Sequence, residues 1–148
     1  MKNISYLLAA ILLVVSFPVI ANKTPASVEY SWKVTKVKDG DTVEFEANFL
    51  PKPLKPVLSV RVFGVDTPEK APRAKCEAEA QLGLKASEYT KKAVAEAKDI
   101  KVSLMSWDKF GGRVLGDVIL DGKSLRQGLI QAGLAREYYG EAKESWCK

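Results

Sequence analysis

The chain has 148 residues, with 23 lysines and arginines, 18 aspartates and glutamates, two cysteines and no histidine. The lack of histidine excludes Ser-His-Asp and Cys-His nucleophiles and His-ligated zinc, and two cysteines cannot close a structural zinc site. Acid–base catalysis must therefore come from carboxylates, Tyr, Lys or Arg. Any metal must be bound by oxygen, which favours a hard cation such as calcium or magnesium.

The first 21 residues have the pattern of a secretory signal peptide. Lys2 precedes an apolar run over residues 7–15, and Ala21 supplies the small residue at the cleavage site. The alternative is a membrane anchor, but the apolar stretch is short for one and includes Ser and Pro. We expect cleavage, a single domain over residues 22–148, and a secreted or periplasmic protein without stable membrane association.

Export makes the cysteine pair informative. Cys76 and Cys147 are an even pair in a compartment that permits oxidation, so we expect a disulfide, with two buried thiols as the alternative. The bond would tie the C-terminus to the middle of the chain.

The first half of the mature chain is predicted to form strands and loops. Alternating apolar residues predict strands over 32–38 and 42–48, and the Asp39-Gly40 pair between them is a hairpin signal. Three prolines in the segment 49–56 predict an exposed loop. A third strand is expected over 57–63, and a second loop over 64–76.

The second half begins with a change of period from two to 3.6. Apolar residues at steps of three and four predict an amphipathic helix over 83–98. Two strands and a second helix follow, with Ser124 as its N-cap and Gly133 as its stop. The segments expected here are the strand 100–106, the Gly-rich turn 107–113, the strand 114–120, the helix 124–132, and a short helix or ordered loop over 134–148.

This order of elements predicts an α+β fold that is mainly β. Three strands, a helix, two strands and a helix suggest a five-stranded OB-fold barrel with two to three flanking α-helices. A plain β-sandwich is the alternative.

Acidic residues at the first hairpin are the first candidate site. Strand alternation places Asp41 on the same side as Val43 and Phe45, where a carboxylate at the rim of an apolar face needs a partner. The simpler interpretation is a hairpin turn with hydrogen bonds from Asp39 and Asp41.

The second candidate lies at the end of the third strand. Arg61 stands in a strand otherwise made of Val, Leu, Ser and Phe, and the turn Asp66-Thr67-Pro68-Glu69 presents two carboxylates on a backbone restricted by proline. A proline turn with a solvated Glu69 is the alternative.

The third candidate is the turn 107–113. Its Gly-Gly pair allows close approach of a ligand. Lys109, Arg113 and the two aromatic residues, Trp107 and Phe110, suit contacts to phosphate and base. Taken alone, this segment is better interpreted as an ordinary hairpin loop.

Together these motifs resemble the staphylococcal nuclease (thermonuclease) family. The shared segments, in order over residues 32–140, are Asp39-Gly40-Asp41-Thr42, Arg61, Val65-Asp66-Thr67-Pro68-Glu69, Asp108-Lys109-Phe110-Gly111-Gly112-Arg113 and Gly133-Leu134-Ala135. The resemblance implies an OB-fold barrel and a calcium-dependent phosphodiesterase that cuts DNA and RNA. We expect single strands to be the preferred substrate and the protein to be a monomer.

The resemblance also implies a role for each matching residue. Asp41, Asp66 and the carbonyl of Thr67 would bind calcium, which accepts six to eight oxygen ligands. Glu69 would activate or orient the attacking water, and Arg61 and Arg113 would neutralise the phosphate. Further substrate contacts would come from Lys109, Phe110, Tyr138 and Tyr139.

Two other functions fit parts of the sequence. A noncatalytic OB-fold protein that binds single-stranded nucleic acid would explain the basic charge and the aromatic residues, but it would not need Asp41, Asp66 and Glu69 together. A glycosidase could use a carboxylate pair on a small barrel. The arginines beside the carboxylates favour phosphate over sugar.

Overall fold

The computed structural model describes residues 28–147, so the predicted signal peptide lies outside the described residues. In chain order the elements are β1 (Glu29–Tyr30), β2 (Val34–Asp39), β3 (Thr42–Glu46), β4 (Val57–Val62), β5 (Val65–Asp66), α1 (Glu77–Glu96), β6 (Ile100–Trp107), β7 (Arg113–Leu120), β8 (Lys123–Ser124), α2 (Leu125–Gln131) and β9 (Arg136–Glu137). Within this part of the chain, no helix is long and apolar enough to cross a membrane.

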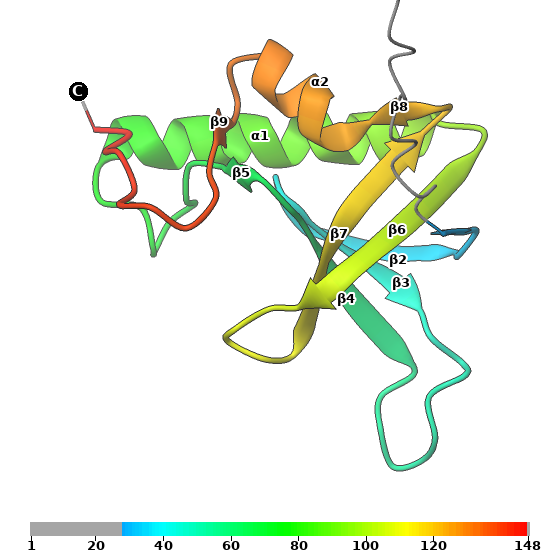
Figure 1. The fold of residues 1–148 in the computed structure, drawn as a ribbon. Helices are drawn as coiled ribbons and strands as arrows, with labels where there is room; N and C mark the ends of the chain where they lie inside the picture. The colour runs from blue at the N-terminus through cyan, green and yellow to red at the C-terminus, as the bar shows by residue number, and fades with distance from the viewer. Residues whose placement is uncertain (1–27, 148) are drawn as a thin grey trace, which may run out of the picture.

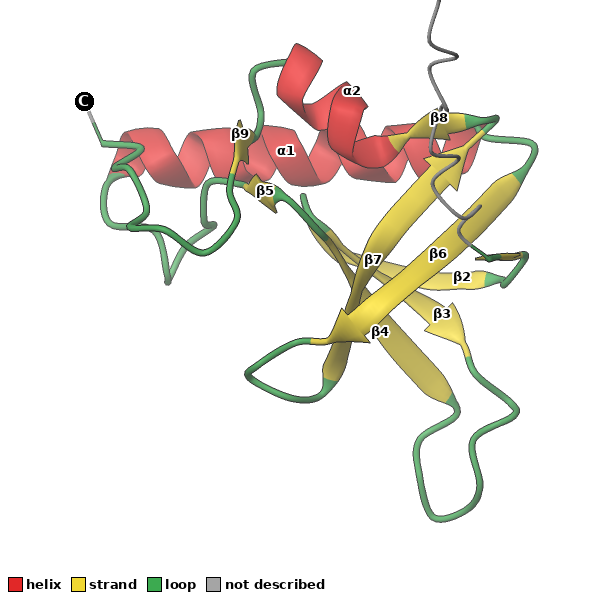
Figure 2. Ribbon diagram, in the orientation of Figure 1, coloured by secondary structure: helices red, strands yellow, loops and turns green. Residues whose placement is uncertain are grey.

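One mixed sheet forms the body of the molecule (Figures 1 and 2). Its strand order is β1-β6-β7-β4-β3-β2, with β8 paired to β7, and β4 and β7 run parallel while the other pairs are antiparallel. The α+β class and the five predicted strands are confirmed, each strand within two residues of its expected bounds. The expected closure of a barrel is not confirmed, because between residues 28 and 147 no strand pairing joins the two ends of the sheet.

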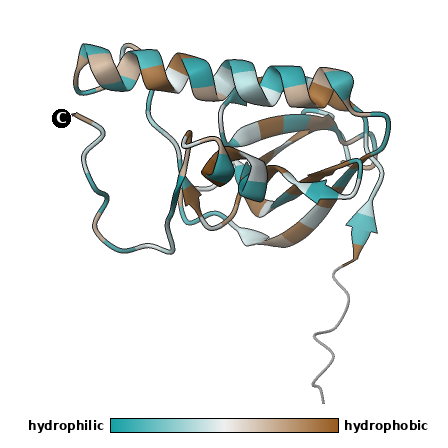
Figure 3. Ribbon diagram, turned by 90° about the horizontal axis from the view of Figure 1, so that it is seen from above, coloured by the Kyte–Doolittle hydropathy of each residue, from teal (hydrophilic) through white to brown (hydrophobic). Residues whose placement is uncertain are grey.

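The core lies between the curved sheet and the two helices. Alternate residues of the strands point inward, so that Val43, Phe45 and Val60 are fully buried while Glu44 and Glu46 stay partly exposed. Leu125 and Leu129 of α2 complete the apolar cluster. Figure 3 shows apolar and polar positions alternating along the strands below α1.

Helix α1 starts earlier than the apolar period predicts, at Glu77 instead of residue 83. The N-cap is Cys76, whose sulfur accepts a hydrogen bond from the N–H of Glu79, and two glutamates in the first turn complement the helix dipole. Small residues form most of its buried face, which is why apolar periodicity missed the first turns. The buried residues are Glu79, Ala80, Gly83, Ala86, Ser87 and Thr90.

The C-terminal tail returns to the start of α1. Strand β9 pairs with β5, with Val65 opposite Glu137 and Asp66 opposite Arg136. The tail then ends in a disulfide between Cys147 and Cys76, whose Cα atoms are 6.0 Å apart. The predicted disulfide is confirmed, and the tail is an ordered loop with a two-residue strand instead of a third helix.

Candidate active site

A cavity of about 550 Å³ opens where the β2–β3 turn, the segment after β4, the β6–β7 loop and the tail meet. It collects nine of the predicted site residues. These are Asp41, Arg61, Thr67, Glu69, Lys109, Phe110, Arg113, Tyr138 and Tyr139. Six basic and four acidic side chains line it, which gives the wall a surplus of positive charge.

Asp41 and Arg61 face each other at the base of this cavity. Asp41 closes the β2–β3 turn and is only 4% exposed, and its Oδ2 lies 3.1 Å from Nη2 of Arg61. The hydroxyl of Thr42 donates to Oδ1 over 2.9 Å. Burial raises the pKa of Asp41, the guanidinium of Arg61 lowers it and nearby Asp39 raises it, with a net upward shift. The guanidinium of Arg61 therefore does not fully offset the cost of burying the ionised carboxylate.

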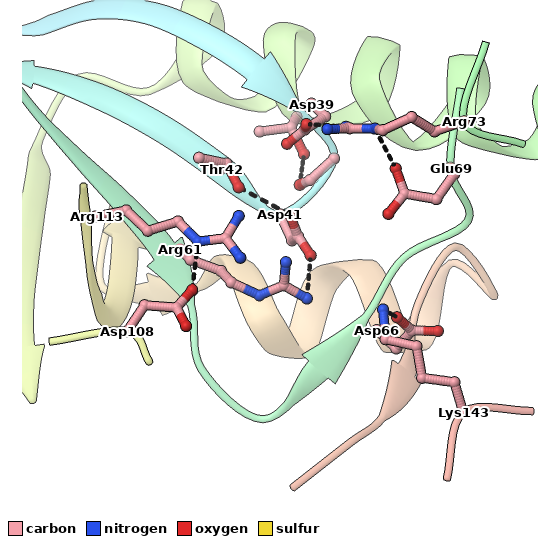
Figure 4. A network of polar contacts seen from close by, with 12 residues as sticks. Asp39, Asp41, Thr42, Arg61, Asp66, Glu69, Arg73, Asp108, Arg113 and Lys143 are labelled. Atoms are coloured by element: carbon pink, nitrogen blue, oxygen red, sulfur yellow. Dashed lines mark hydrogen bonds and ion pairs between the residues drawn. The ribbon is translucent and has the colours of Figure 1, made fainter. Parts of the chain in front are cut away.

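Glu69 lies beyond the proline turn and pairs with a second arginine. Its Oε2 is 3.0 Å from Nε of Arg73, and Nη2 of Arg73 is 3.3 Å from Oδ2 of Asp39 (Figure 4). The backbone here lies directly on α1, because a Cβ at Gly83 would stand 2.4 Å from the carbonyl oxygen of Glu69. Helix α1 therefore fixes the position of Glu69 through close backbone contact.

Arg113 and its partner Asp108 both come from the β6–β7 loop and its ends. Nε of Arg113 donates to Oδ2 of Asp108, which leaves both terminal amino groups of the guanidinium outside that contact (Figure 4). Burial raises the pKa of Asp108, but the hydrogen bonds from Arg113 and the N–H of Phe110, with the charges of Arg113 and Arg61, lower it overall. Asp108 is thus an ionised anchor for Arg113.

Asp66 is the one predicted charged residue that does not line this cavity. It borders a neighbouring pocket of about 130 Å³, where its Oδ1 lies 2.5 Å from Nζ of Lys143 and its Oδ2 accepts from the indole N–H of Trp146 over 3.1 Å. Within residues 28–147 no group of three or more carboxylate or cysteine side chains is arranged to hold a metal ion. The structure therefore brings Asp41 and Thr67 to the cavity and directs Asp66 toward the tail.

Several residues of the cavity, or their contacts, were not predicted from the sequence. Asp108 was visible in the motif, but only the structure reveals its contact with Arg113. Arg73 and Lys143 carried no local signal, since their contacts join segments far apart in sequence. Trp107, one of the two aromatic residues of the predicted turn, is 69% exposed at the cavity, as Phe110 is at 77%.

Comparison with protein-family models finds a match to the staphylococcal nuclease homologue family over residues 59–146. The match covers more than half of the chain and runs from within β4 to the tail. The chain belongs to this family. Its members are typically phosphodiesterases that cut nucleic acids and typically use Ca²⁺, and their fold is the OB fold, which agrees with the order of the five long strands here.

Proposed function

We propose that this protein is a calcium-dependent nuclease that hydrolyses phosphodiester bonds of DNA and RNA, with single strands preferred. The observation that carries the proposal is the convergence of Arg61, Arg113 and Glu69 on one cavity, where the carboxylate faces a wall with surplus positive charge. A neutral sugar carries no negative charge that could interact with this positive wall, so the arrangement favours a phosphate over a glycosidic substrate.

The two arginines suit the charge that develops on a phosphate under attack. Each guanidinium has five N–H donors, and each spends only part of them on Asp41 or Asp108. The remaining donors are available to the phosphate oxygens. Because Asp41 and Asp108 fix the two planes before substrate arrives, little reorganisation is needed in the transition state.

Glu69 is assigned the role of general base. Its carboxylate is partly exposed to the cavity and to solvent, so it can hydrogen-bond a water molecule while its Oε2 contacts Arg73. In hydrolysis the water oxygen forms a bond to phosphorus, a proton passes to Glu69, and the bond to the leaving ester oxygen breaks.

Calcium suits the oxygen donors of this site. Asp41 is a buried carboxylate that one guanidinium does not fully compensate, and Oδ1 of Asp66 is buried without a regular hydrogen bond, although Lys143 lies beside it. Both are hard anionic ligands, and the carbonyl of Thr67 would join them. When bound, the cation supplies positive charge to the phosphate oxygens and lowers the pKa of coordinated water.

We also propose that the protein acts outside the cytoplasm, as a secreted or periplasmic monomer. The disulfide supports this location, because such bonds persist in oxidising compartments. The cleavage of residues 1–21 remains part of the same proposal.

The alternative function, noncatalytic binding of single strands, is favoured by the exposed rings of Trp107 and Phe110. One experiment separates the two. Mature protein is incubated with single-stranded DNA in calcium, and then with excess chelator. We expect cleavage only in calcium. Binding without cleavage in calcium would establish the alternative, and equal cleavage in chelator would exclude the metal assignment.

A further inference from the structure

Two groups from the tail hold the carboxylate of Asp66. The ammonium of Lys143 lies 2.5 Å from Oδ1, and the indole N–H of Trp146 donates to Oδ2 over 3.1 Å. Both oxygens are thus in contact with donors from a segment about 80 residues later in the chain. The Asp66 side chain is only 8% exposed, whereas that of Lys143 is 44% exposed, so the carboxylate is the buried partner of this ion pair.

The tail segment that carries these donors is fixed at three points. The guanidinium of Arg136 lies 3.7 Å from the centre of the Trp146 ring, and its Nη1 donates to the carbonyl of Ser145 over 3.1 Å. Strand β9 pairs with β5 beside Asp66. The Cys76–Cys147 disulfide closes the arrangement. Lys143 therefore meets Asp66 at a high effective concentration.

Lys143 also reaches the main cavity. Its side chain is partly exposed and lines both the 550 Å³ cavity and the smaller pocket that contains Asp66. Figure 4 shows it beside Asp66. A rotation of this long, flexible side chain would move the ammonium from the carboxylate to the cavity wall without moving the backbone. The residue thus stands between the two sites and has two places for its charge.

We propose that Lys143 is an internal cation that competes with calcium for Asp66. The proposal rests on the proposed function, since it takes Asp66 as a calcium ligand. An ammonium in contact with Oδ1 and a metal ion on the same oxygen exclude each other, so binding of the metal requires release of Lys143. The tail thereby sets the metal affinity, and the disulfide sets how readily Lys143 returns.

The competition predicts that removal of the ammonium tightens metal binding. An ion pair that is partly out of solvent exceeds the value of exposed pairs, so Lys143→Gln should lower the dissociation constant for calcium about three- to tenfold. Lys101→Gln is the matched control: it removes the same charge from a lysine that pairs with Glu29 and Asp99 at the other end of β6. The control corrects for the lost net charge.

The test is calorimetric titration of the disulfide-bonded proteins with calcium alone, without substrate. Tighter binding in Lys143→Gln than in Lys101→Gln supports the proposal. Equal constants in the two variants overturn it, and weaker binding in Lys143→Gln overturns it in favour of a tail that positions Asp66 for the metal. Absence of calcium binding by wild-type protein would instead refute the proposed metal dependence, so the two failures are distinguishable.

A second variant keeps the proposal testable if Lys143→Gln destabilises the tail. Joint replacement of Cys76 and Cys147 by serine leaves Lys143 in place but removes the covalent closure, which lowers its effective concentration at Asp66. Competition predicts tighter calcium binding here too. Unchanged or weaker binding by a variant whose circular dichroism matches wild type would overturn the role given to the disulfide-held tail.

Discussion

Replacement of Glu69 by glutamine separates a catalytic carboxylate from a structural one. Glutamine keeps the size of the side chain and loses the negative charge. A general base contributes about 10² to 10⁴ in rate, which corresponds to about 3–5 kcal/mol of activation free energy. The ion pair with Arg73 is a smaller quantity, because the Arg73 side chain is 66% exposed and pairs of this kind contribute at most about 1 kcal/mol to folding.

The two quantities are measured separately. We expect Glu69→Gln to lower kcat on a single-stranded oligonucleotide in calcium about 100-fold or more, while thermal unfolding shifts by only a few degrees. Arg73→Gln breaks the same ion pair and keeps the carboxylate, so its kcat should fall less than tenfold. Equal losses of kcat in both variants would show that Glu69 acts only through the pair. A raised KM with unchanged kcat in Glu69→Gln would also refute its role as base.

Four further outcomes follow from the site and the fold. Arg61→Lys and Arg113→Lys should each lower kcat/KM about tenfold or more, because an ammonium cannot hold a carboxylate and fork onto a phosphate together; wild-type turnover in either would contradict this. Trp107→Ala should weaken binding of single-stranded DNA in chelator about 5- to 100-fold, the value of one stacked base, whereas an unchanged dissociation constant would remove the ring from the binding surface. Cys147→Ser should lower the free energy of unfolding by up to about 4 kcal/mol in denaturant titrations, since the lost bond closes a long loop; an unchanged midpoint would refute this. Asp117 of β7 accepts hydrogen bonds from the N–H of Val118 and the hydroxyl of Ser124, but burial raises its pKa overall. The folding stability linked to its protonation is therefore fully present below pH 3.8 and is lost as pH rises through the folded pKa. In thermal unfolding, the stability of Asp117→Asn relative to wild type should therefore increase as pH rises from 3 to 7. A decrease over that range would refute the upward pKa shift.

The strands were predictable because their signal is local. Alternation along β3 and β7 puts every second residue in the core, and the Asp39-Gly40 turn fixes the register of the first hairpin. The cap and stop of α2, at Ser124 and Gly133, follow equally local rules and are confirmed. The short strands β5 and β9 were missed, since two-residue elements have no period and depend on pairing between distant segments.

The sequence motifs predicted which residues come together better than they predicted their contacts. Asp41, Arg61 and Glu69 come from motifs far apart in sequence and line one cavity, whereas their roles stay predictions. Which basic side chain pairs with which acidic side chain depends on packing across the molecule, as in the pairing of Asp66 with Lys143. Sequence spacing does not predict this pairing, because it depends on a two-residue strand and on the disulfide-bonded tail.

Whether the basic residue is an arginine or a lysine decides how its ion pair affects ligand binding. A guanidinium can give one edge to a carboxylate and another to a phosphate, so the contacts of Arg61 with Asp41 and of Arg113 with Asp108 preorganise the site without blocking it. The ammonium of Lys143 is a compact point charge, so its attraction to Asp66 is lost when it turns to any other anion. On the proposed function, the arginine pairs would persist when substrate binds, whereas the lysine pair would have to open for the metal. This difference is why substitution of the arginines should impair function, while substitution of Lys143 should strengthen metal binding.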